Sequence, residues 1–502
     1  MRDYTIRKDF PLTAEQNEVV EFMLQRSKCI NACQTGLGKT YSSLTALTYL
    51  LLKYPDTHAI IIVPQKAVKA FKRELDGKLK IMYNVLTSHE ENINGNARIT
   101  IITYTSLHKF LPYIDGLHKT KKLILMCDEA HILGDSNNKI YTMIASIRHY
   151  FNVCWFLTAT PLKNDISGLF WLFNMLDPNI FKDWNTFKQS FCVIERRKIM
   201  RAVGKGNNKR KSSAMIEEII GYKNLDVLKE ILDKYVILKQ KEYNLEFLYH
   251  SVELDGYLVE PYLEAGKGLL RESSKDSFGV RLHDIQSVVD NINPYYKTNT
   301  MTNKEQMLIK LVAYKIRRNE PTIIYCDYND VIDRLETLLN YSKKITGLEQ
   351  ILKVTGEVTQ KKREKVEEQI NEKTVVLITS AGTESINLQK ANSIIFYDIP
   401  YSIVALIQCI GRVTRMDSKF DKQYIHFIET IGTIDTYKKY LIQSNIGLIT
   451  MVFGKMETLP LDLNSKDKAY SSQVKDALLW CFKQGRLLTE KEINKLILKN
   501  IL

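Results

Sequence analysis

The sequence has 502 residues, and its 71 Lys and Arg residues outnumber its 57 Asp and Glu residues, which gives a formal net charge of +14. Hydrophobic residues make up 45% of the chain and charged residues 25%, so a wholly disordered chain, a collagen-like chain and a low-complexity scaffold are excluded. At roughly 150 residues per domain we expect about three domains. The basic balance favours a polyanionic partner such as nucleic acid.

The sequence contains no segment that predicts a membrane partner. No apolar run approaches the ~18 residues that a membrane span needs, and the polar N-terminal segment MRDYTIRKDF does not resemble a signal peptide. We therefore expect a cytoplasmic protein. The eight cysteines are scattered singly, which favours reduced thiols over disulfides or a zinc site.

Residues 1–190 alternate short apolar runs with helix-length amphipathic stretches. Such alternation predicts an α/β domain whose parallel sheet is covered by helices on both faces. Ligands bind at the carboxyl ends of the strands in such sheets. The predicted strands are KCINAC (28–33), HAIIIVP (58–64), RITIITY (98–104), KLILMCDEA (122–130) and VCWFLTATP (153–161).

Residues 191–298 are expected to form a helical and basic connector. Within it, segment 196–212 has eight Lys and Arg residues, no acidic residue and two glycines, which predicts a mobile basic loop. This loop either grips DNA or is solvated without a ligand. Its run NKRKS also resembles a nuclear-import patch, so a nuclear location stays open. The candidate nucleic-acid-binding residues are Arg196, Arg197, Lys209, Arg210 and Lys211.

A second alternating block over 299–450 predicts another parallel-sheet α/β domain, and residues 451–502 have the periodicity of a helical C-terminal cap. The predicted strands of this block are TIIYCDY (322–328), ILKVTGE (351–357), TVVLITSAG (374–382), NSIIFYDIP (392–400) and QYIHFIET (423–430).

The segment TGLGKT (35–40) follows a predicted strand and opens a predicted helix. Glycine residues in this context let backbone N–H groups approach phosphates, Lys39 reaches the terminal phosphates, and the Thr40 hydroxyl can ligate Mg²⁺. The alternative is a Gly-rich turn that happens to precede Lys-Thr. The candidate nucleotide-binding residues of this loop are Thr35, Gly36, Gly38, Lys39 and Thr40.

The segment CDEAH (127–131) ends a predicted strand about ninety residues later. Two adjacent carboxylates suit a divided task, in which Asp128 holds Mg²⁺ and Glu129 polarises the attacking water. His131 is a candidate for sensing the bound nucleotide, with a purely structural histidine as the alternative. Thr158 and Thr160, in LTATP, could link this site to the other domain by hydrogen bonds.

The segment QCIGRVTR (408–415) has helical spacing and places Arg412 and Arg415 on one helix face. A nucleotide held by the first domain needs positive charge from elsewhere in the transition state, and such an arginine finger is worth roughly 10³–10⁵ in rate. We expect this pair to make ATP hydrolysis depend on closure between the two domains.

The ordered motifs GLGKT, DEAH, LTATP, ITSAG and QCIGRVTR resemble those of superfamily-two helicases and translocases. LTATPLKNDISGLFWLFNMLDP (157–178) is similar to the LTGTPLQN signature of the Swi/Snf-like branch, and IETIGTID (428–435) resembles the GTID ending of that branch. The resemblance covers about residues 10–440. It implies two RecA-like domains in tandem, with ATP and Mg²⁺ as cofactors.

The resemblance also implies roles for further residues. Gln16 would contact adenine, Gln408 would face the γ-phosphate, and four residues would lie near a nucleic-acid backbone: Pro64, Thr103, Tyr104 and Thr379. The sequence departs from the family at AGTESINL (381–388), where Thr383 and Ser385 replace glycines.

The leading hypothesis is a monomeric ATP-dependent motor on duplex or branched DNA, including branch migration in replication, recombination or repair. The alternatives are an ATP-gated DNA-binding clamp or recruiting subunit, and an RNA helicase. The compact size favours a viral or bacterial source.

Overall fold

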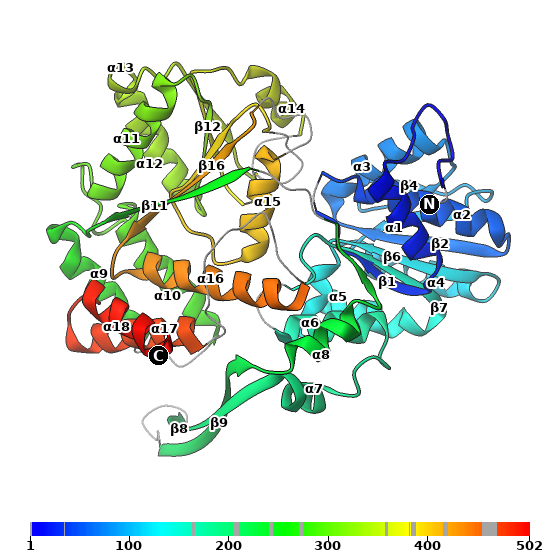
Figure 1. Cartoon of the computed structure of the whole chain (residues 1–502), viewed down its shortest axis with the longest axis horizontal. Coiled ribbons are helices and arrows are strands. Elements are labelled where there is room, and N and C mark those ends of the chain that lie inside the picture. The colour runs from blue at the N-terminus through cyan, green and yellow to red at the C-terminus, as the bar shows by residue number, and fades with distance from the viewer. Residues whose placement is uncertain are drawn as a thin grey trace.

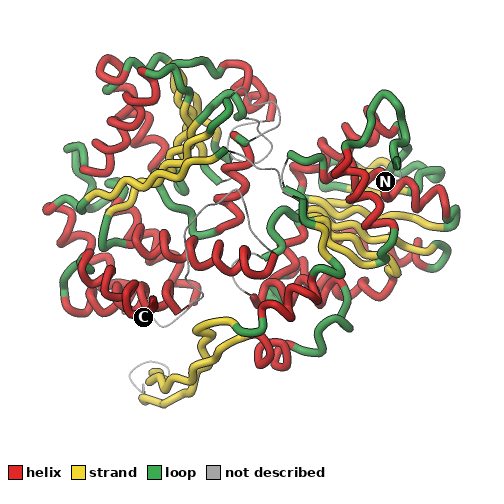
Figure 2. Tube along the Cα trace, viewed as in Figure 1, coloured by secondary structure: helices red, strands yellow, loops and turns green. Residues whose placement is uncertain are grey.

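The computed structural model describes all residues except 1–2, 35, 163–165, 204–209, 240–243, 271–274, 357–359, 381, 383–387, 415–419, 454–468 and 502. The chain forms two α/β units, one at the N-terminal side and one toward the C-terminus, and a two-stranded ribbon projects from the first (Figure 1). In each unit the strands gather in a central sheet with helices around it (Figure 2). The predicted tandem of parallel-sheet domains is confirmed.

The first unit is built on an eight-stranded sheet with the order β10-β1-β7-β6-β2-β5-β3-β4 within the described residues. All neighbouring strands run parallel except the pair formed by β3 and β4. The five strands predicted in this part of the chain are all present. The strands are β1 (Lys28–Asn31), β2 (Thr57–Val63), β3 (Asn84–Leu86), β4 (Glu91–Asn92), β5 (Ile99–Thr103), β6 (Lys122–Asp128), β7 (Phe151–Leu157) and β10 (Val236–Ile237).

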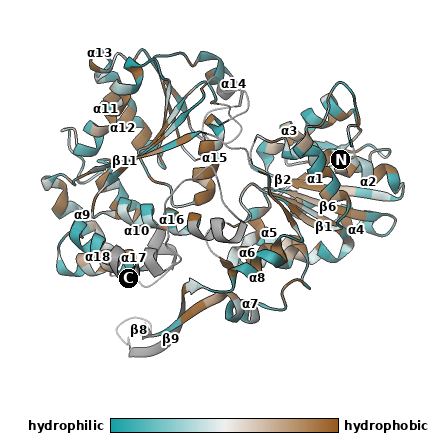
Figure 3. Ribbon diagram, viewed as in Figure 1, coloured by the Kyte–Doolittle hydropathy of each residue, from teal (hydrophilic) through white to brown (hydrophobic). Residues whose placement is uncertain are grey.

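Two hydrophobic layers cover the faces of this sheet. One face packs against α1, α2 and α3, and the other packs against α4, α5 and α6. Because both faces are covered, the central strands β2, β5 and β6 are mainly buried apolar runs, and much of the sheet is brown in Figure 3. The helices and turns are α1 (Ala14–Leu24), α2 (Lys39–Lys53), η1 (Gln65–Ala67), α3 (Val68–Arg73), η2 (Glu74–Leu79), α4 (Leu107–His118), η3 (Ala130–Gly134), α5 (Lys139–Ile147), η4 (Arg148–Tyr150), α6 (Ile166–Leu176), α7 (Trp184–Phe191) and α8 (Leu225–Leu232).

In the part of the second unit that the structure describes, six strands form a parallel sheet with the order β11-β16-β15-β12-β14-β13. One face packs against α11 and α12, and the other packs against α14 and α15. The strands are β11 (Leu245–Val252), β12 (Thr322–Tyr325), β13 (Gln350–Val354), β14 (Thr374–Ile378), β15 (Ser393–Phe396) and β16 (Gln423–Thr430). The helices are α9 (Gly256–Leu270), α10 (Lys275–Val289), α11 (Asn303–Arg317), α12 (Asn329–Tyr341), α13 (Lys343–Thr346), α14 (Gln360–Gln369), α15 (Ile403–Val413) and α16 (Ile434–Phe453).

The segment 191–298 differs from the predicted helical connector. Its strand β10 pairs with β1 in the first sheet, and its strand β11 pairs with β16 in the second sheet. Both strands were missed, because β10 has only two residues and β11 is half-buried along its length. The segment therefore belongs to both units.

The prediction of a mobile basic loop over 196–212 is wrong for the described residues. Strands β8 (Cys192–Val203) and β9 (Arg210–Tyr222) pair antiparallel in a long ribbon. The ribbon lies outside both central sheets. Its sequence lacks the regular hydrophobic alternation by which a strand is recognised.

The predicted C-terminal cap is helical, with α17 (Ala469–Gln484) and α18 (Glu490–Ile501). Phe482 of α17 lies among side chains of α9 and α10, including Tyr262 and Ile285. In addition, α16 extends from the second unit and packs against α8 of the first (Figure 1). Within the described residues, no helix is long and apolar enough to cross a membrane.

Candidate functional site

The loop before α2 has the backbone geometry of a phosphate-binding loop. Gly36 and Gly38 adopt left-handed conformations with φ of +92° and +74°, and Gly38 caps the N-terminus of α2. The Lys39 ammonium donates to the Cys33 carbonyl at 2.9 Å, which folds the side chain back over the loop. Backbone N–H groups at the start of a 15-residue helix favour an anion at this point.

Gln16 contacts this loop directly. Its side chain completes a capping box with Thr13 at the start of α1, and its Nε2 donates to the Leu37 carbonyl at 3.1 Å. A Cβ atom at Gly38 would collide with Nε2 of Gln16. The structure therefore brings Gln16, Gly38 and Lys39 together.

Asp128 and Glu129 lie at the carboxyl end of β6, with β7 between this strand and β1. Glu129 has a φ of +49°, a strained conformation for a residue with a side chain. Its Oε2 lies 3.3 Å from Nδ1 of His131, and the same nitrogen lies 3.3 Å from Oγ1 of Thr158. Thr158 in turn accepts a hydrogen bond from the backbone N–H of Thr160 at 3.1 Å. His131 thus connects the end of β6 to the end of β7.

The two carboxyl groups have opposite pKa shifts. Burial and the neighbouring Glu129 raise the pKa of Asp128, and Lys39 offsets part of this increase. Burial also acts to raise the pKa of Glu129, but the hydrogen bond and charge of His131, together with Lys39 and Lys66, hold that pKa below its usual range. Lys39 acts on both carboxyl groups because the ends of β1 and β6 face the same space.

Lys66 is a residue that the sequence analysis did not select. It lies in η1, directly after β2, and β2 neighbours β6 in the sheet. A single lysine after a strand carries no pattern, and only the strand order shows that its charge faces the two carboxyl groups.

Gln408 and Arg412 lie on α15, on the side of the second unit that is turned toward the first (Figure 1). Nearly all residues of this helix are buried. The partly exposed residues are Ala405, Gln408 and Arg412, which follow one another at helical spacing and form a single stripe.

The residues predicted near a nucleic-acid backbone also lie at strand ends. Pro64 follows β2, and Thr103 is the last residue of the neighbouring β5, where it lies opposite Val63. The Tyr104 hydroxyl donates to the Asp128 carbonyl at 2.7 Å, and its side chain is buried. Thr379 follows β14 and is also buried. Tyr104 therefore links β5 to the carboxylate site.

In the ribbon, Arg196 is committed to an ion pair with Glu217, whose carboxylate also contacts Lys188 at 2.7 Å. The distance between Arg196 and Glu217 is 3.1 Å. Arg197 lies opposite Ile216, Arg210 opposite Val203, and Lys211 opposite Ala202 in the strand register. Thr35, Arg415 and Lys209 lie outside the described residues.

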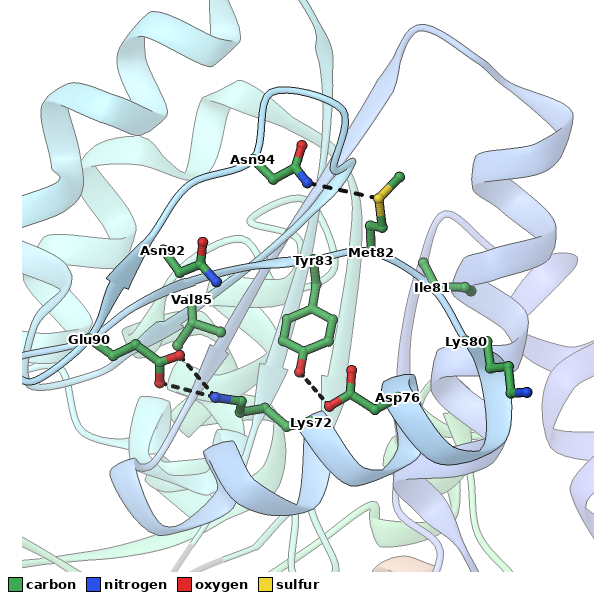
Figure 4. A pocket seen from close by; sticks show the side chains of 10 residues that line it. All are labelled: Lys72, Asp76, Lys80, Ile81, Met82, Tyr83, Val85, Glu90, Asn92 and Asn94. Atoms are coloured by element: carbon green, nitrogen blue, oxygen red, sulfur yellow. Dashed lines mark hydrogen bonds and ion pairs between the residues drawn. The ribbon is translucent and has the colours of Figure 1, made fainter.

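A hollow of about 410 Å³ lies at the other edge of the first sheet, away from these strand ends. Figure 4 shows polar contacts among the residues that line it, including Lys72 to Glu90 at 2.9 Å and Tyr83 to Asp76 at 2.8 Å. Its residues come from α3, η2 and the β3–β4 hairpin, so the hollow is separate from the site.

Comparison with known protein families agrees with this geometry. The family model of the SNF2-related domain matches residues 15–258, and that of the helicase conserved C-terminal domain matches residues 303–417. The chain belongs to the Swi/Snf-like branch of the superfamily-two helicases. The first match contains Lys39, Asp128 and Glu129, and the second contains Gln408 and Arg412.

Several curated relatives of this Swi/Snf-like chain are proteins of DNA repair. A DNA repair and recombination protein RAD54-like from Drosophila mojavensis is 24% identical, with 86% of this chain and 63% of the relative covered. The DNA repair protein rhp54 from Schizosaccharomyces pombe is 24% identical, with coverages of 81% and 53%. An uncharacterised ATP-dependent helicase, YqhH, from Bacillus subtilis is 23% identical, with coverages of 88% and 80%. The chain thus spans less than two thirds of the length of the first two relatives.

Among solved structures, the chain is similar to the Sulfolobus solfataricus SWI2/SNF2 ATPase core in complex with dsDNA. The identity is 17% and the TM-score is 0.40, and the match covers 99% of this chain and 98% of that one.

Proposed function

We propose that this chain is a nucleic-acid-stimulated ATPase that translocates along or remodels duplex or branched DNA. The observation that carries the proposal is the convergence of Lys39, which follows β1, with Asp128 and Glu129 at the end of β6, where His131 keeps Glu129 ionised. This is the set of groups that phosphoryl transfer to water requires.

The described residues fit ATP and Mg²⁺. The left-handed glycines leave space beside the N-terminus of α2 for phosphates, with Lys39 as the cation and Gln16 at the adenine end. Mg²⁺ is usually held by one or two carboxylates together with substrate phosphates, so Asp128 and Thr40 would suffice. The ion would neutralise charge on the phosphates. Glu129 would accept a proton from the attacking water, because its lowered pKa keeps it ionised near neutral pH.

The second unit would complete the site on closure. Gln408 and Arg412 on the partly exposed stripe of α15, with Arg415 beyond it, would bring positive charge and a hydrogen-bonding amide to the γ-phosphate. Hydrolysis would then depend on how the two units approach each other.

The DNA partner is supported by the relatives, whose names place them in DNA repair and recombination. The strand ends that carry Pro64, Thr103 and Thr379 are proposed to lie near the phosphate backbone of the nucleic acid. The basic outer part of the ribbon would add a second contact. Such contacts to the phosphate backbone carry little sequence preference.

The test is to measure ATPase activity with single-stranded, duplex, forked and four-way DNA, and with RNA. We expect stimulation by duplex or branched DNA, and Glu129→Gln should lower kcat by about 10²-fold or more while ATP binding is retained. Glu90→Gln is the matched control, since Glu90 pairs with Lys72 at the far edge of the same sheet. Absence of stimulation by any nucleic acid at low salt would overturn the proposal.

Displacement of a third strand from a triplex would report movement along duplex DNA. Stimulation by RNA alone would instead identify an RNA helicase. A chain whose Glu129→Gln variant keeps its biological effect would be a DNA-binding clamp.

A further inference from the structure

A cluster of buried charges lies in the second unit, where β12, β15 and β16 end. Lys304, on α11, lies 2.8 Å from Asp290 and 2.9 Å from Asp435. Lys438, on α16, lies 3.5 Å from Asp327, which follows β12. The two lysines, Asp290 and Asp435 are almost fully buried. Charges are rarely buried in this way, because desolvation costs on the order of several kcal/mol per ion.

Asp398 connects this cluster to the chain that leads into α15. It follows β15, and its carboxylate accepts hydrogen bonds from Gln286 Nε2 at 3.2 Å and from the Asp327 backbone N–H at 3.1 Å. Lys304 lies 3.9 Å from the same carboxylate. Burial acts to raise the pKa of Asp398. The opposing effect of the Lys438 and Lys304 charges is larger, so the pKa is lowered overall and this carboxylate stays ionised.

Tyr401 forms the second anchor of the same segment. The Lys438 ammonium lies 4.3 Å from the centroid of the Tyr401 ring, within the range of a cation–π contact. Among the described residues this ammonium has no hydrogen-bond partner. Its charge is compensated by the ring face and by the nearby carboxylates of Asp398, Asp327 and Asp435. Ser402 then caps α15, with its hydroxyl oxygen accepting from the Val404 N–H at 3.2 Å.

The segment 398–402 is thus held at Asp398 and at Tyr401, immediately before α15 begins. Gln408 and Arg412 lie seven and eleven residues beyond Tyr401 on the same helix. A small rotation at the start of a rigid helix displaces the groups at its end. A 1 Å misplacement in an active site can cost about 10²-fold in rate.

We infer that Lys438 and Tyr401 are positioning residues that orient α15, and through it Gln408 and Arg412, for ATP hydrolysis. The inference rests on the proposed function, because it explains how the second unit presents these two side chains to the nucleotide. It also assigns a role to a buried lysine that the helicase motifs do not contain.

The chain contains a matched control for this contact. Lys315 is also a buried lysine on the second unit, its ammonium lies 3.8 Å from the centroid of the Tyr424 ring, and it pairs with Glu320 at 3.0 Å. Tyr424 lies at the start of β16, whereas α15 follows the carboxyl end of β15. The two lysine–tyrosine contacts are therefore chemically alike and lie toward opposite ends of the sheet.

The experiment compares Tyr401→Leu and Tyr401→Phe with Tyr424→Leu. Phe keeps the ring face, so Tyr401→Phe should retain the wild-type kcat of the DNA-stimulated ATPase. Tyr401→Leu should lower kcat about tenfold or more, with the KM for ATP within about twofold, since the first unit binds the nucleotide. Tyr424→Leu should lower thermal stability and leave kcat unchanged in the folded protein.

Amide hydrogen exchange in residues 403–413 provides a readout that does not depend on ATPase activity. Exchange should be about tenfold faster in Tyr401→Leu and unchanged in Tyr424→Leu, because local opening depends on local contacts. The inference would be overturned if α15 exchanged at the wild-type rate in Tyr401→Leu. Equal losses of kcat in Tyr401→Leu and Tyr424→Leu would also overturn it. So would a Tyr401→Leu variant with the wild-type kcat that only needs a higher DNA concentration for half-maximal stimulation. Absence of ATPase activity in the wild-type chain would contradict the proposed function. The exchange rates would still decide whether Tyr401 holds α15 in place.

Discussion

Nδ1 of His131 lies 3.3 Å from Oε2 of Glu129, and the imidazole links this carboxylate to the hydroxyl of Thr158, which follows β7. Burial acts to raise the pKa of Glu129, and the hydrogen bond and charge of the His131 imidazole offset this effect. His131 therefore sets the protonation state of the proposed general base, in addition to any contact with nucleotide.

Replacement of His131 by Ala should move the acid limb of the kcat–pH profile to higher pH. The pKa of Glu129 is lowered mainly through His131, so its removal leaves burial as the dominant effect and raises that pKa. Because the base works only when ionised, activity at pH 6 should fall more than activity at pH 8. Steady-state ATPase rates across this range measure the shift. Thr158→Val is the control that keeps the imidazole, and an unshifted acid limb in His131→Ala would contradict the assignment.

Substitution of Gly38 by Ala should weaken ATP binding more than substitution of Gly36 by Ala. Both glycines have positive φ, so each alanine carries a conformational cost of about 1–2 kcal/mol. Only at Gly38 does the new Cβ also collide with Gln16, whereas no atom lies within 4 Å of the corresponding position at Gly36. Titration with a fluorescent ATP analogue measures both dissociation constants. Equal affinities would show that Gln16 does not shape the loop in solution.

Neutralising the outer ribbon should reduce the salt dependence of DNA binding. Replacing Arg197, Lys198, Arg201, Arg210 and Lys211 with Gln removes basic residues that lie opposite apolar residues or serine in the strand register. The slope of log K against log salt should become less steep by about 0.9 for each phosphate that the ribbon no longer neutralises. Arg196→Gln should change the slope less, because Glu217 already pairs with that side chain at 3.1 Å. Binding isotherms at several salt concentrations measure this slope. A slope that is unchanged in the five-residue variant would show that the ribbon is solvated and does not contact DNA.

The stability of the chain should fall as the pH drops from 6.5 toward 4. Burial lowers the pKa of His58 to about 4, below the 6.5 of an unperturbed histidine, so the unfolded chain binds the proton first. The contribution of His58 is therefore complete above pH 6.5 and is lost at about 1.4 kcal/mol per pH unit below it. Denaturant titrations of His58→Asn should give a flatter pH dependence than the wild type. His89 is exposed, so the control His89→Asn should show the pH dependence of the wild type. The assignment would be refuted if the free energy of unfolding of His58→Asn changed with pH as steeply as that of the wild type.

Much of the fold could be predicted because buried parallel strands must be continuous apolar runs. The strands β2 and β14 are fully buried along their length, and each follows a helix. The nucleotide loop could be predicted for a related reason. A glycine-rich turn between a strand and a helix has few other uses, and Gly36 and Gly38 do adopt the left-handed conformations that only glycine enters at low cost.

The remaining features depend on contacts that sequence spacing does not encode. Lys438 and Asp398 would ordinarily be assigned to a solvated surface, since charged residues are seldom fully buried. Their burial becomes visible only when α16 and the end of β15 are placed together. Likewise, the ion pair of Arg196 with Glu217 joins two strands whose register the sequence does not specify.

The position of β11 has a consequence for work with parts of this chain. A fragment beginning at residue 299 would keep the apolar strands of the second unit but lose Leu245–Val252, which pairs along the whole length of β16. The open edge of β16 would then offer free backbone N–H and C=O groups to another molecule, and such edges promote aggregation. A fragment intended to behave as an independent second unit should therefore begin before Leu245.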